Sequence, residues 1–339
     1  MKNSHSAERR TGKTATVCAT VAAALGLTLA HSARAADPVI GADDITWALQ
    51  LSERYSYPRV HPNITYHIAN NFEDKLDLYV AQEGGKPRPT LIYFHPGGWM
   101  GELTKDIFAF DVLPFLQLGW NVVNAEYRPS TVSPAPAAVE DGVCALRWVI
   151  RSASRYGFNA DQIIVMGQSA GGTLALTTGM IPLSASGLGG PCGLDDISDP
   201  TTGQRRNPAV DGKIAAIIDW FGPTDIAEVA EGPAQQDYAV NWLGNQVDRL
   251  AVAKLVSPLS YVRRGLPPTI MIYGDKDPAV PYSQAVRLRD ALTNVGVPNK
   301  LVTIRGGGHG RFGMLATRDA YDQIFEFLDK AGVKIRPDR

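Results

Sequence analysis

The six residues Gly167-Gln168-Ser169-Ala170-Gly171-Gly172 follow directly on the apolar run Gln162-Ile163-Ile164-Val165-Met166. The stretch after them, 173–179, is compatible with a helix. A strand that ends at a glycine-flanked serine and leads into a helix is the context in which Gly-x-Ser-x-Gly presents a nucleophile. Glycines are needed because such a turn is too tight for β-carbons beside the serine. The sequence therefore predicts Ser169 as a nucleophile, beside the positive end of the following helix.

Strand-like and helix-like segments alternate along the chain on both sides of this turn. Segments 64–69 and 76–80 alternate apolar and polar residues, which is typical of an antiparallel start to a sheet. Later runs are continuously apolar, as buried parallel strands are, with amphipathic helical segments between them. The pattern predicts an α/β fold with a mostly parallel eight-stranded sheet and helices on both faces. We expect the other strands at 90–94, 121–125, 163–166, 214–218, 269–273 and 301–304, and helices at 139–150, 285–295 and 321–328.

Two long segments fit no element of this core. Pro182–Asp211 is rich in Gly, Pro, Ser and Asp, and Ala227–Val262 is longer and mixed in composition. Loops of this length in a compact domain are usually functional. Both segments leave the carboxyl side of the predicted sheet. We therefore expect them to be insertions that form a lid over the site, without the long apolar helix that opens at an oil–water interface.

A serine hydroxyl needs a base that takes its proton and an acid that orients the base. His309 stands in the glycine-rich loop 305–310 directly after the last predicted strand, where it can reach the carboxyl ends of the strands. The chain order Ser, Asp, His places the acid in the turn after the preceding strand. Two aspartates lie there. We predict Asp277 as the orienting acid and expect Asp275 to hold the turn through its side chain.

The loop His95-Pro96-Gly97-Gly98-Trp99 follows a predicted strand, at the place where an oxyanion loop belongs. Pro96 has no amide hydrogen and cannot donate a hydrogen bond. The N–H groups of Gly97 and Gly98, joined by that of Ala170 behind the serine, are the predicted donors. Such donors stabilise the negative oxygen of the transition state.

Several polar residues favour a structural role. We expect His95 to hold the oxyanion loop by a hydrogen bond, and His61 and His67 to have surface or structural roles. The pair Tyr127-Arg128 and the acidic pair Glu140-Asp141 are expected to form a structural ion pair under the site. These expectations leave His309 as the base.

Aromatic residues at the ends of the predicted strands allow two interpretations. Trp99, Trp220 and Phe221 are placed to line an acyl or alcohol pocket, yet residues at such positions are as often simply core. Both interpretations stay open. The acidic stretch 195–199 matches no calcium-binding spacing, so we expect a solvated loop there, no metal site and no cofactor.

The segments 95–99, 167–172, 274–278 and 308–310 together resemble the α/β-hydrolase esterases related to hormone-sensitive lipase. They are most similar to the bacterial group that contains feruloyl and acetylxylan esterases. Glycine is usual in the family where this chain has Pro96. The resemblance implies an α/β-hydrolase fold and a serine carboxylesterase that cleaves short-chain or aryl esters, acetyl and feruloyl esters among them, as small molecules or on polysaccharides. It implies the same triad, Ser169, Asp277 and His309, as the reasoning above.

Two other functions remain open. An amide hydrolase, formamidase-like or prolyl-oligopeptidase-like, shares the triad and a similar oxyanion loop. A non-catalytic binding protein could also use this fold. The presence of all three triad residue types and of the oxyanion glycines disfavours the binding protein.

The first 35 residues are predicted to be a bacterial signal peptide. They have a basic start, an apolar run at 15–30 and a small-x-small site at Ala33-Arg34-Ala35. The run is short for a membrane span of about 20 residues. Residues 1–35 carry five Lys/Arg and one Glu, which leaves the rest at −5 from a total of −1. We expect a secreted or periplasmic single α/β-hydrolase domain at 36–339, with no stable membrane anchor and no nucleic-acid partner.

Two cysteines remain after this segment, Cys144 and Cys192. An oxidising compartment permits a disulfide between them. However, Cys144 lies in an amphipathic helical pattern, and there a buried free thiol is the commoner outcome. We therefore expect free thiols, with the disulfide as the alternative.

Overall fold

The computed structural model describes residues 59–81, 86–101, 104–105, 111–182, 188, 192, 213–310 and 312–336. All of them belong to the second of two compact units, residues 50–339. The predicted signal peptide and the first part of the predicted domain lie outside the described residues, as does the acidic stretch 195–199.

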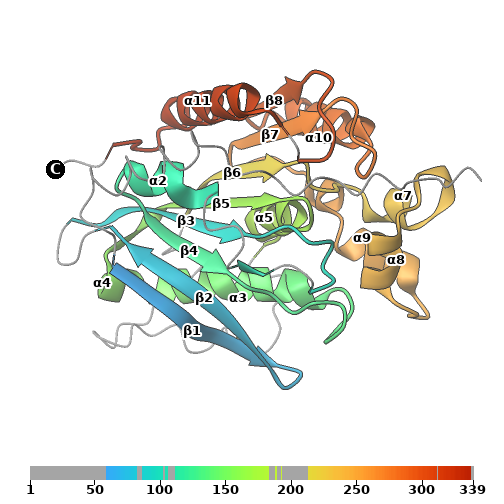
Figure 1. The fold of residues 1–339 in the computed structure, drawn as a ribbon, viewed down its shortest axis with the longest axis horizontal. Coiled ribbons are helices and arrows are strands. Elements are labelled where there is room, and N and C mark those ends of the chain that lie inside the picture. Colours follow the sequence, from blue (N-terminus) through green and yellow to red (C-terminus); the bar gives the residue numbers. More distant parts are fainter. Residues whose placement is uncertain are drawn as a thin grey trace, which may run out of the picture. The chain divides into compact units, whose positions relative to one another are not determined.

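Eight strands form one sheet at the centre of this unit (Figure 1). The strands are β1 (Arg59–Ala69), β2 (Phe72–Val80), β3 (Arg88–Phe94), β4 (Asn121–Ala125), β5 (Phe158–Gln168), β6 (Ile214–Trp220), β7 (Thr269–Gly274) and β8 (Asn299–Ile304). Their order in the sheet is β1-β2-β4-β3-β5-β6-β7-β8. The β1–β2 and β2–β4 pairs are antiparallel, and the other five pairs are parallel. The predicted sheet and its antiparallel start are confirmed.

Burial explains why the sequence of the central strands is mostly apolar. Every residue of β4 and of β7 is buried. The edge strands β1 and β8 mix buried and exposed positions. Strands covered on both faces are mostly apolar, as β7 is, although β4 also buries Asn121 and Asn124; half-covered edge strands carry more polar residues.

Helices cover both faces of the sheet (Figure 1). On β6, Ile217 lies against Gly179 of one helix, while Trp220 contacts Tyr321 of another. Positions three apart in a strand point to opposite faces. The helix of Gly179 therefore covers one face and that of Tyr321 the other. The helices beside the sheet are α2 (Leu113–Gln117), α3 (Ala137–Arg151), α4 (Ala153–Tyr156), α5 (Ala170–Met180), α10 (Tyr282–Asn294) and α11 (Met314–Lys330).

The segment Ala227–Val262 is built from short helical pieces. They are α7 (Ile226–Ala230), η2 (Gly232–Ala234), α8 (Asp237–Leu243), α9 (Arg249–Leu255) and η3 (Pro258–Tyr261). No helix in this segment is longer than seven residues. Of the other predicted lid segment, Pro182–Asp211, only positions 182, 188 and 192 are among the described residues.

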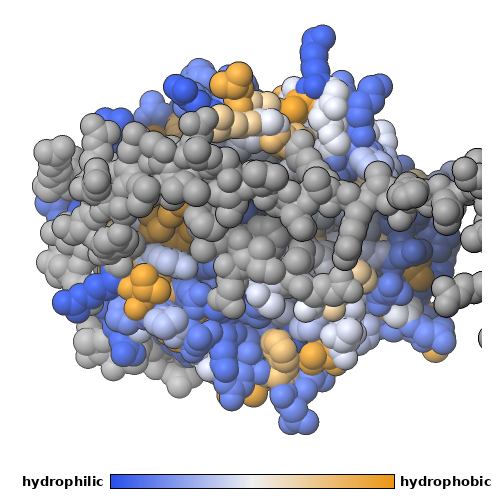
Figure 2. Space-filling model, in the orientation of Figure 1, coloured by the Kyte–Doolittle hydropathy of each residue, from blue (hydrophilic) through white to orange (hydrophobic). Residues whose placement is uncertain are grey.

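The described surface is mixed in polarity. In the face that Figure 2 shows, coloured hydrophobic residues form small separate groups among hydrophilic ones. Large apolar side chains exposed on the described part of the chain are few, and Val247 and Leu315 are the most exposed. Within the described ranges, no helix combines the length and the hydrophobicity that a membrane span requires.

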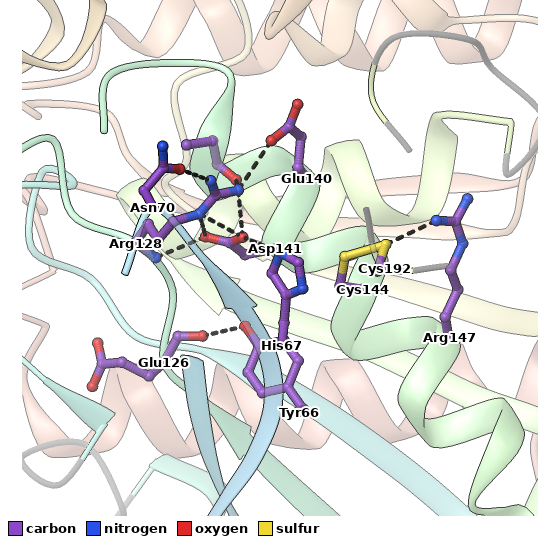
Figure 3. Close-up of polar contacts among 11 residues, drawn as sticks. Tyr66, His67, Asn70, Glu126, Arg128, Glu140, Asp141, Cys144, Arg147 and Cys192 are labelled. Atoms are coloured by element: carbon purple, nitrogen blue, oxygen red, sulfur yellow. Dashed lines mark hydrogen bonds and ion pairs between the residues drawn. A yellow bond between two sulfur atoms is a disulfide. The ribbon is translucent and has the colours of Figure 1, made fainter. Parts of the chain in front are cut away.

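Cys144 and Cys192 form a disulfide, with their Cα atoms 5.5 Å apart (Figure 3). The expectation of free thiols was therefore wrong. Cys144 is buried in α3, as the helical pattern implied, but burial in a helix does not prevent pairing when a loop brings the partner. Cys192 comes from the long segment after α5, and α5 packs against α3. The bond therefore links this segment to α3.

Candidate active site

Ser169 lies between the end of β5 and the first residue of α5, with φ 52° and ψ −119°. This backbone conformation is rare and costly for a residue with a side chain. A β-carbon on Gly167 would lie 2.1 Å from the carbonyl oxygen of Gly171. One on Gly171 would lie 2.1 Å from the carbonyl oxygen of Phe94. Both glycines are therefore required by close backbone approach, and the turn presents the serine at the carboxyl end of β5.

The three side chains predicted to act together, Ser169, His309 and Asp277, meet in the structure. Ser169 Oγ lies 2.8 Å from His309 Nε2. On the other side of the ring, His309 Nδ1 lies 2.7 Å from Asp277 Oδ2. Ser169 and His309 are 140 positions apart in the sequence, so the fold and no local motif joins them. The arrangement lets the imidazole accept the serine proton at Nε2 while Nδ1 donates to the carboxylate.

Asp277 is fixed by its own turn. Its side chain is fully buried, and Oδ1 accepts hydrogen bonds from the backbone N–H groups of Ala279 and Val280, at 2.8 and 2.9 Å. Asp275 points elsewhere, because its Oδ1 accepts from the N–H of Gly306 at 2.6 Å. This bond joins the turn after β7 to the loop that carries the histidine, as expected of a turn-holding residue.

The predicted oxyanion loop lies beside the serine turn. β3 and β5 are neighbours in the sheet, with Phe94 paired to Gly167, so the loops that follow them leave the same edge. Gly97 has φ 134° and Gly98 has φ 59°, both in the region that favours glycine. Ala170, buried at the N-terminus of α5, stands next to the serine. The structure therefore brings the loop that carries Gly97 and Gly98 to the same edge of the sheet as Ala170, and the role of their N–H groups as oxyanion donors stays a prediction.

His95 holds the predicted oxyanion loop 95–99 in place through hydrogen bonds. Its Nδ1 lies 2.7 Å from the Pro96 carbonyl oxygen, and its Nε2 lies 2.7 Å from Glu126 Oε1. The ring stacks on Tyr127, whose hydroxyl donates to the His95 carbonyl oxygen at 3.0 Å. The other Glu126 oxygen accepts from the N–H of Lys105. The expected loop-holding role of this histidine is what the contacts show.

The three aromatic residues with two interpretations are all buried. Trp99 is fully buried and stacks on Trp242 of α8, with ring centroids 3.7 Å apart. Trp220 packs on Tyr321. These contacts favour the core interpretation for both tryptophans. Phe221 is also buried, but its ring meets the ring of His309 edge-on at 4.9 Å. It therefore forms a wall directly behind the histidine.

Tyr238 of α8 reaches the site from the predicted lid segment, and sequence reasoning missed it. A β-carbon on Gly98 would lie 3.0 Å from the Tyr238 β-carbon, so the two residues are in contact. The Tyr238 hydroxyl donates to the Ala279 carbonyl oxygen at 3.0 Å. Burial and then the charge of Asp277 raise the pKa of Tyr238. The side chain thus spans the distance from the oxyanion loop to the turn of the acid.

A second missed group lies behind the site. The Tyr273 hydroxyl is 2.6 Å from Asp219 Oδ2 and also contacts the Gly222 carbonyl oxygen. Asp219 is fully buried, and burial raises its pKa to about 7. The contact between the two side chains carries no local sequence signal, because they come from neighbouring strands far apart in the chain.

The predicted structural ion pair is present. Arg128 lies 2.7 Å from Asp141 and 3.0 Å from Glu140, and its Nη1 donates to Asn70 (Figure 3). The structure also buries His67 beside this pair, and burial and then the Arg128 charge lower the pKa of that histidine. None of these side chains belongs to the Ser–His–Asp arrangement.

Comparisons with known proteins find a family model and several esterases that are similar to this chain. The family model described as BD-FAE matches residues 76–292. "Esterase LipQ" of Mycobacterium tuberculosis is 27% identical over 267 residues, which are 76% of this chain and 59% of LipQ. "Carboxylesterase NlhH" of the same organism is 34% identical over 146 residues, covering 40% of this chain and 45% of NlhH. The chain therefore spans about half the length of the curated relatives it matches.

Solved structures with the same fold include two esterases. A truncated carbohydrate esterase from gut microbiota superposes with a TM-score of 0.64 at 23% identity, covering 81% of this chain and 98% of that chain. The esterase Est2 of Thermogutta terrifontis with bound propionate superposes with a TM-score of 0.64 at 26% identity, covering 84% and 97%. These likenesses confirm the expected α/β-hydrolase fold.

Proposed function

The chain belongs to the BD-FAE family, and from that premise we propose that it is a serine carboxylesterase. The observation that carries the proposal is the continuous contact from Ser169 Oγ through His309 to Asp277, at 2.8 and 2.7 Å. Relatives named esterase and carboxylesterase support an ester as the substrate over an amide.

In the proposed reaction Ser169 Oγ attacks the carbonyl carbon of the ester, and His309 Nε2 takes the serine proton. The carbonyl oxygen becomes negative and accepts hydrogen bonds from the N–H groups of Gly97, Gly98 and Ala170. His309 then gives the proton to the leaving alcohol, and an acyl-enzyme remains. Water, activated by the same histidine, releases the acid and restores the serine.

The proposed substrates are short-chain or aryl carboxylic esters, with acetyl and feruloyl esters as candidates, free or attached to polysaccharide. The oxyanion loop and the acid turn are bridged by Tyr238, and Phe221 closes the space behind His309. We propose that these bulky side chains limit the room for an acyl chain. Binding of propionate by the Est2 protein supports a small acyl group. Each methylene that stays outside forgoes about 0.8 kcal/mol of burial.

We further propose that residues 1–35 direct export and are removed, so that the protein works in the periplasm or outside the cell. Two observations support this proposal. The basic start, apolar run and Ala33-Arg34-Ala35 follow the pattern of a signal peptide. The disulfide between Cys144 and Cys192 is of a kind that persists in oxidising compartments.

A labelling and hydrolysis experiment tests the proposal. The purified protein is given p-nitrophenyl acetate, butyrate and laurate, methyl ferulate and an acetylated xylan. Separately it is treated with a fluorophosphonate, and the labelled peptide is identified by mass spectrometry. We expect hydrolysis of the short or aryl esters and a single adduct on Ser169.

The Ser169→Ala variant should lose on the order of 10⁶-fold in turnover. Ser260→Ala is the matched control, because that serine is exposed and its hydroxyl donates to the Lys254 carbonyl oxygen. An adduct on another residue, or full activity of Ser169→Ala, would refute the nucleophile. Faster hydrolysis of laurate than of butyrate would refute the short acyl pocket.

A further inference from the structure

A buried group of potential ligand side chains lies outside the proposed active site. His67 on β1 and Asp74 on β2 are directly paired across the two antiparallel strands, so both side chains stand on one face of the sheet. Asp141 of α3 packs onto that face, with one oxygen 3.8 Å from His67 Nε2. One ligand atom from each of the three residues lies within 4.8 Å of the others.

All three side chains are buried. Among the described residues, polar atoms of Asp74 and His67 lack an ordinary hydrogen-bond partner. Asp74 is fully buried, and its carboxyl faces the carboxyl of Asp141, which offers no hydrogen-bond donor when both groups are ionised. His67 is 7% exposed, and among the described residues its Nε2 has no hydrogen-bond partner. A buried carboxylate without partners is costly, and such groups are normally paired or coordinate a metal.

The charges around the three residues favour a divalent cation. Asp74, Asp141 and Glu140 bring three carboxylates, and Arg128 is the cation that pairs with the last two (Figure 3). Metal binding requires these carboxylates to be ionised, and Arg128 then balances only one of their three negative charges. One divalent ion would neutralise the other two. Arg128 would remain bound to Asp141, because carboxylates that hold metals are commonly also hydrogen-bonded by neighbouring groups.

We propose that His67, Asp74 and Asp141 form a binding site for a first-row divalent metal ion, with Zn²⁺ as the best fit. One imidazole nitrogen and two carboxylate oxygens suit Zn²⁺, whereas Ca²⁺ and Mg²⁺ prefer oxygen ligands alone. Zinc bonds of about 2.0–2.2 Å require the three ligand atoms to draw closer than 4.8 Å. The ion would join the edge hairpin β1–β2 to α3.

The site is structural in this proposal and takes no part in ester cleavage. Its ligands come from β1, β2 and α3, whereas Ser169, His309 and Asp277 follow β5, β8 and β7. Metal binding therefore raises resistance to unfolding and leaves the turnover of the enzyme unchanged. Measuring thermal stability and turnover separately therefore distinguishes a failure of the metal site from a failure of the proposed esterase function.

The test uses the full chain without a histidine tag, first freed of metal by a chelator and buffer exchange. Calorimetric titration with ZnCl₂ should show one saturable site, and CoCl₂ should give the visible absorption bands of nitrogen and oxygen ligation. Zinc at 100 times Kd should raise Tm by about 5 °C. CaCl₂ and MgCl₂ should bind far more weakly.

Asp74→Asn and His67→Gln should each weaken zinc binding by 10-fold or more. Glu73→Gln is the matched control, since Glu73 is adjacent to Asp74 but exposed, and it should bind as the unchanged chain does. Equal affinity in all three variants, or tighter binding of Ca²⁺ or Mg²⁺, would overturn the proposal. If neither ligand variant folds, the unchanged chain decides, because absent zinc binding and absent cobalt bands overturn the site by themselves.

Discussion

Asp277 and His309 are joined by a hydrogen bond of 2.7 Å between Oδ2 and Nδ1, although 32 positions separate them. Asp275, only two residues before, makes its bond of 2.6 Å to the N–H of Gly306 instead. The two aspartates of one turn thus have different tasks. One faces the imidazole, and the other ties the turn to the loop that carries the imidazole.

This difference predicts unequal effects of the same substitution. Asp277→Asn should lower kcat by roughly 10⁴-fold, because an amide stabilises the wrong histidine tautomer and cannot balance the imidazolium. Asp275→Asn keeps an oxygen that can accept from Gly306 and should lower kcat far less. Steady-state hydrolysis of p-nitrophenyl acetate by both variants checks this. A larger loss in Asp275→Asn would show that the acid is assigned to the wrong residue.

The sequence predicted those parts of the site that short motifs carry. Ser169 and Gly97 stand in local patterns whose glycines are required by backbone geometry, and His309 follows a readable strand. Tyr238 could not be predicted in the same way. It reaches the oxyanion loop only because α8 folds over the carboxyl edge of the sheet, and contacts between distant segments leave no local pattern.

The observed ends of the strands also differ in how far the sequence could predict them. The apolar centre of β5 was predicted at 163–166, but the strand begins at Phe158. Its first half contains the polar stretch Asn159-Ala160-Asp161-Gln162, which alone does not indicate a strand. β2 likewise begins at Phe72, through residues Glu73-Asp74-Lys75 that look exposed. Asp74 is nevertheless fully buried, and Asp141 of α3 and Arg128 of the loop after β4 lie near it.

The disulfide predicts a redox-dependent stability. It closes a loop of 48 residues, and in the chain-entropy estimate such a loop stabilises the folded state by about 4 kcal/mol. Cys192→Ser should therefore lower the free energy of unfolding by up to this amount under oxidising conditions. Urea unfolding with and without a reductant measures it.

The reductant provides the control for the disulfide. It should lower the stability of the unchanged chain to that of Cys192→Ser and leave the variant itself unaffected. Equal stability of the unchanged chain with and without reductant, once thiol titration shows full reduction, would contradict a stabilising role.

Trp99 and Phe221 should respond differently to replacement by leucine. Trp99 is fully buried against Trp242, so Trp99→Leu should lower the free energy of unfolding by about 3 kcal/mol and leave the preference for acetate over butyrate within 2-fold. Phe221→Leu removes the ring beside His309 and should lower kcat. Unfolding curves and the ratio of kcat/KM values for the two esters separate these effects. A changed acyl preference in Trp99→Leu would restore that residue as part of the pocket.

Asp219 should make the folded protein less stable as pH rises from about 4 to about 7. Burial raises the pKa of Asp219 from 3.8 to about 7, so within this range the folded state binds a proton that the unfolded state has released. The stabilisation is complete below the unfolded pKa and is lost as pH passes the folded one. Its size is on the order of 4 kcal/mol, since each unit of pKa difference corresponds to about 1.4 kcal/mol.

The protonated carboxyl can donate to the Tyr273 hydroxyl, which then donates to the Gly222 carbonyl oxygen. An asparagine amide reproduces this donor, so Asp219→Asn should keep the network without the titration. Its free energy of unfolding in urea, measured from pH 4.5 to 7.5, should rise relative to the unchanged chain by up to about 3 kcal/mol across the range. The exposed Asp290→Asn variant is the control and should give a constant difference. Parallel curves for Asp219→Asn and the unchanged chain would mean that Asp219 ionises in the folded protein at an ordinary pH.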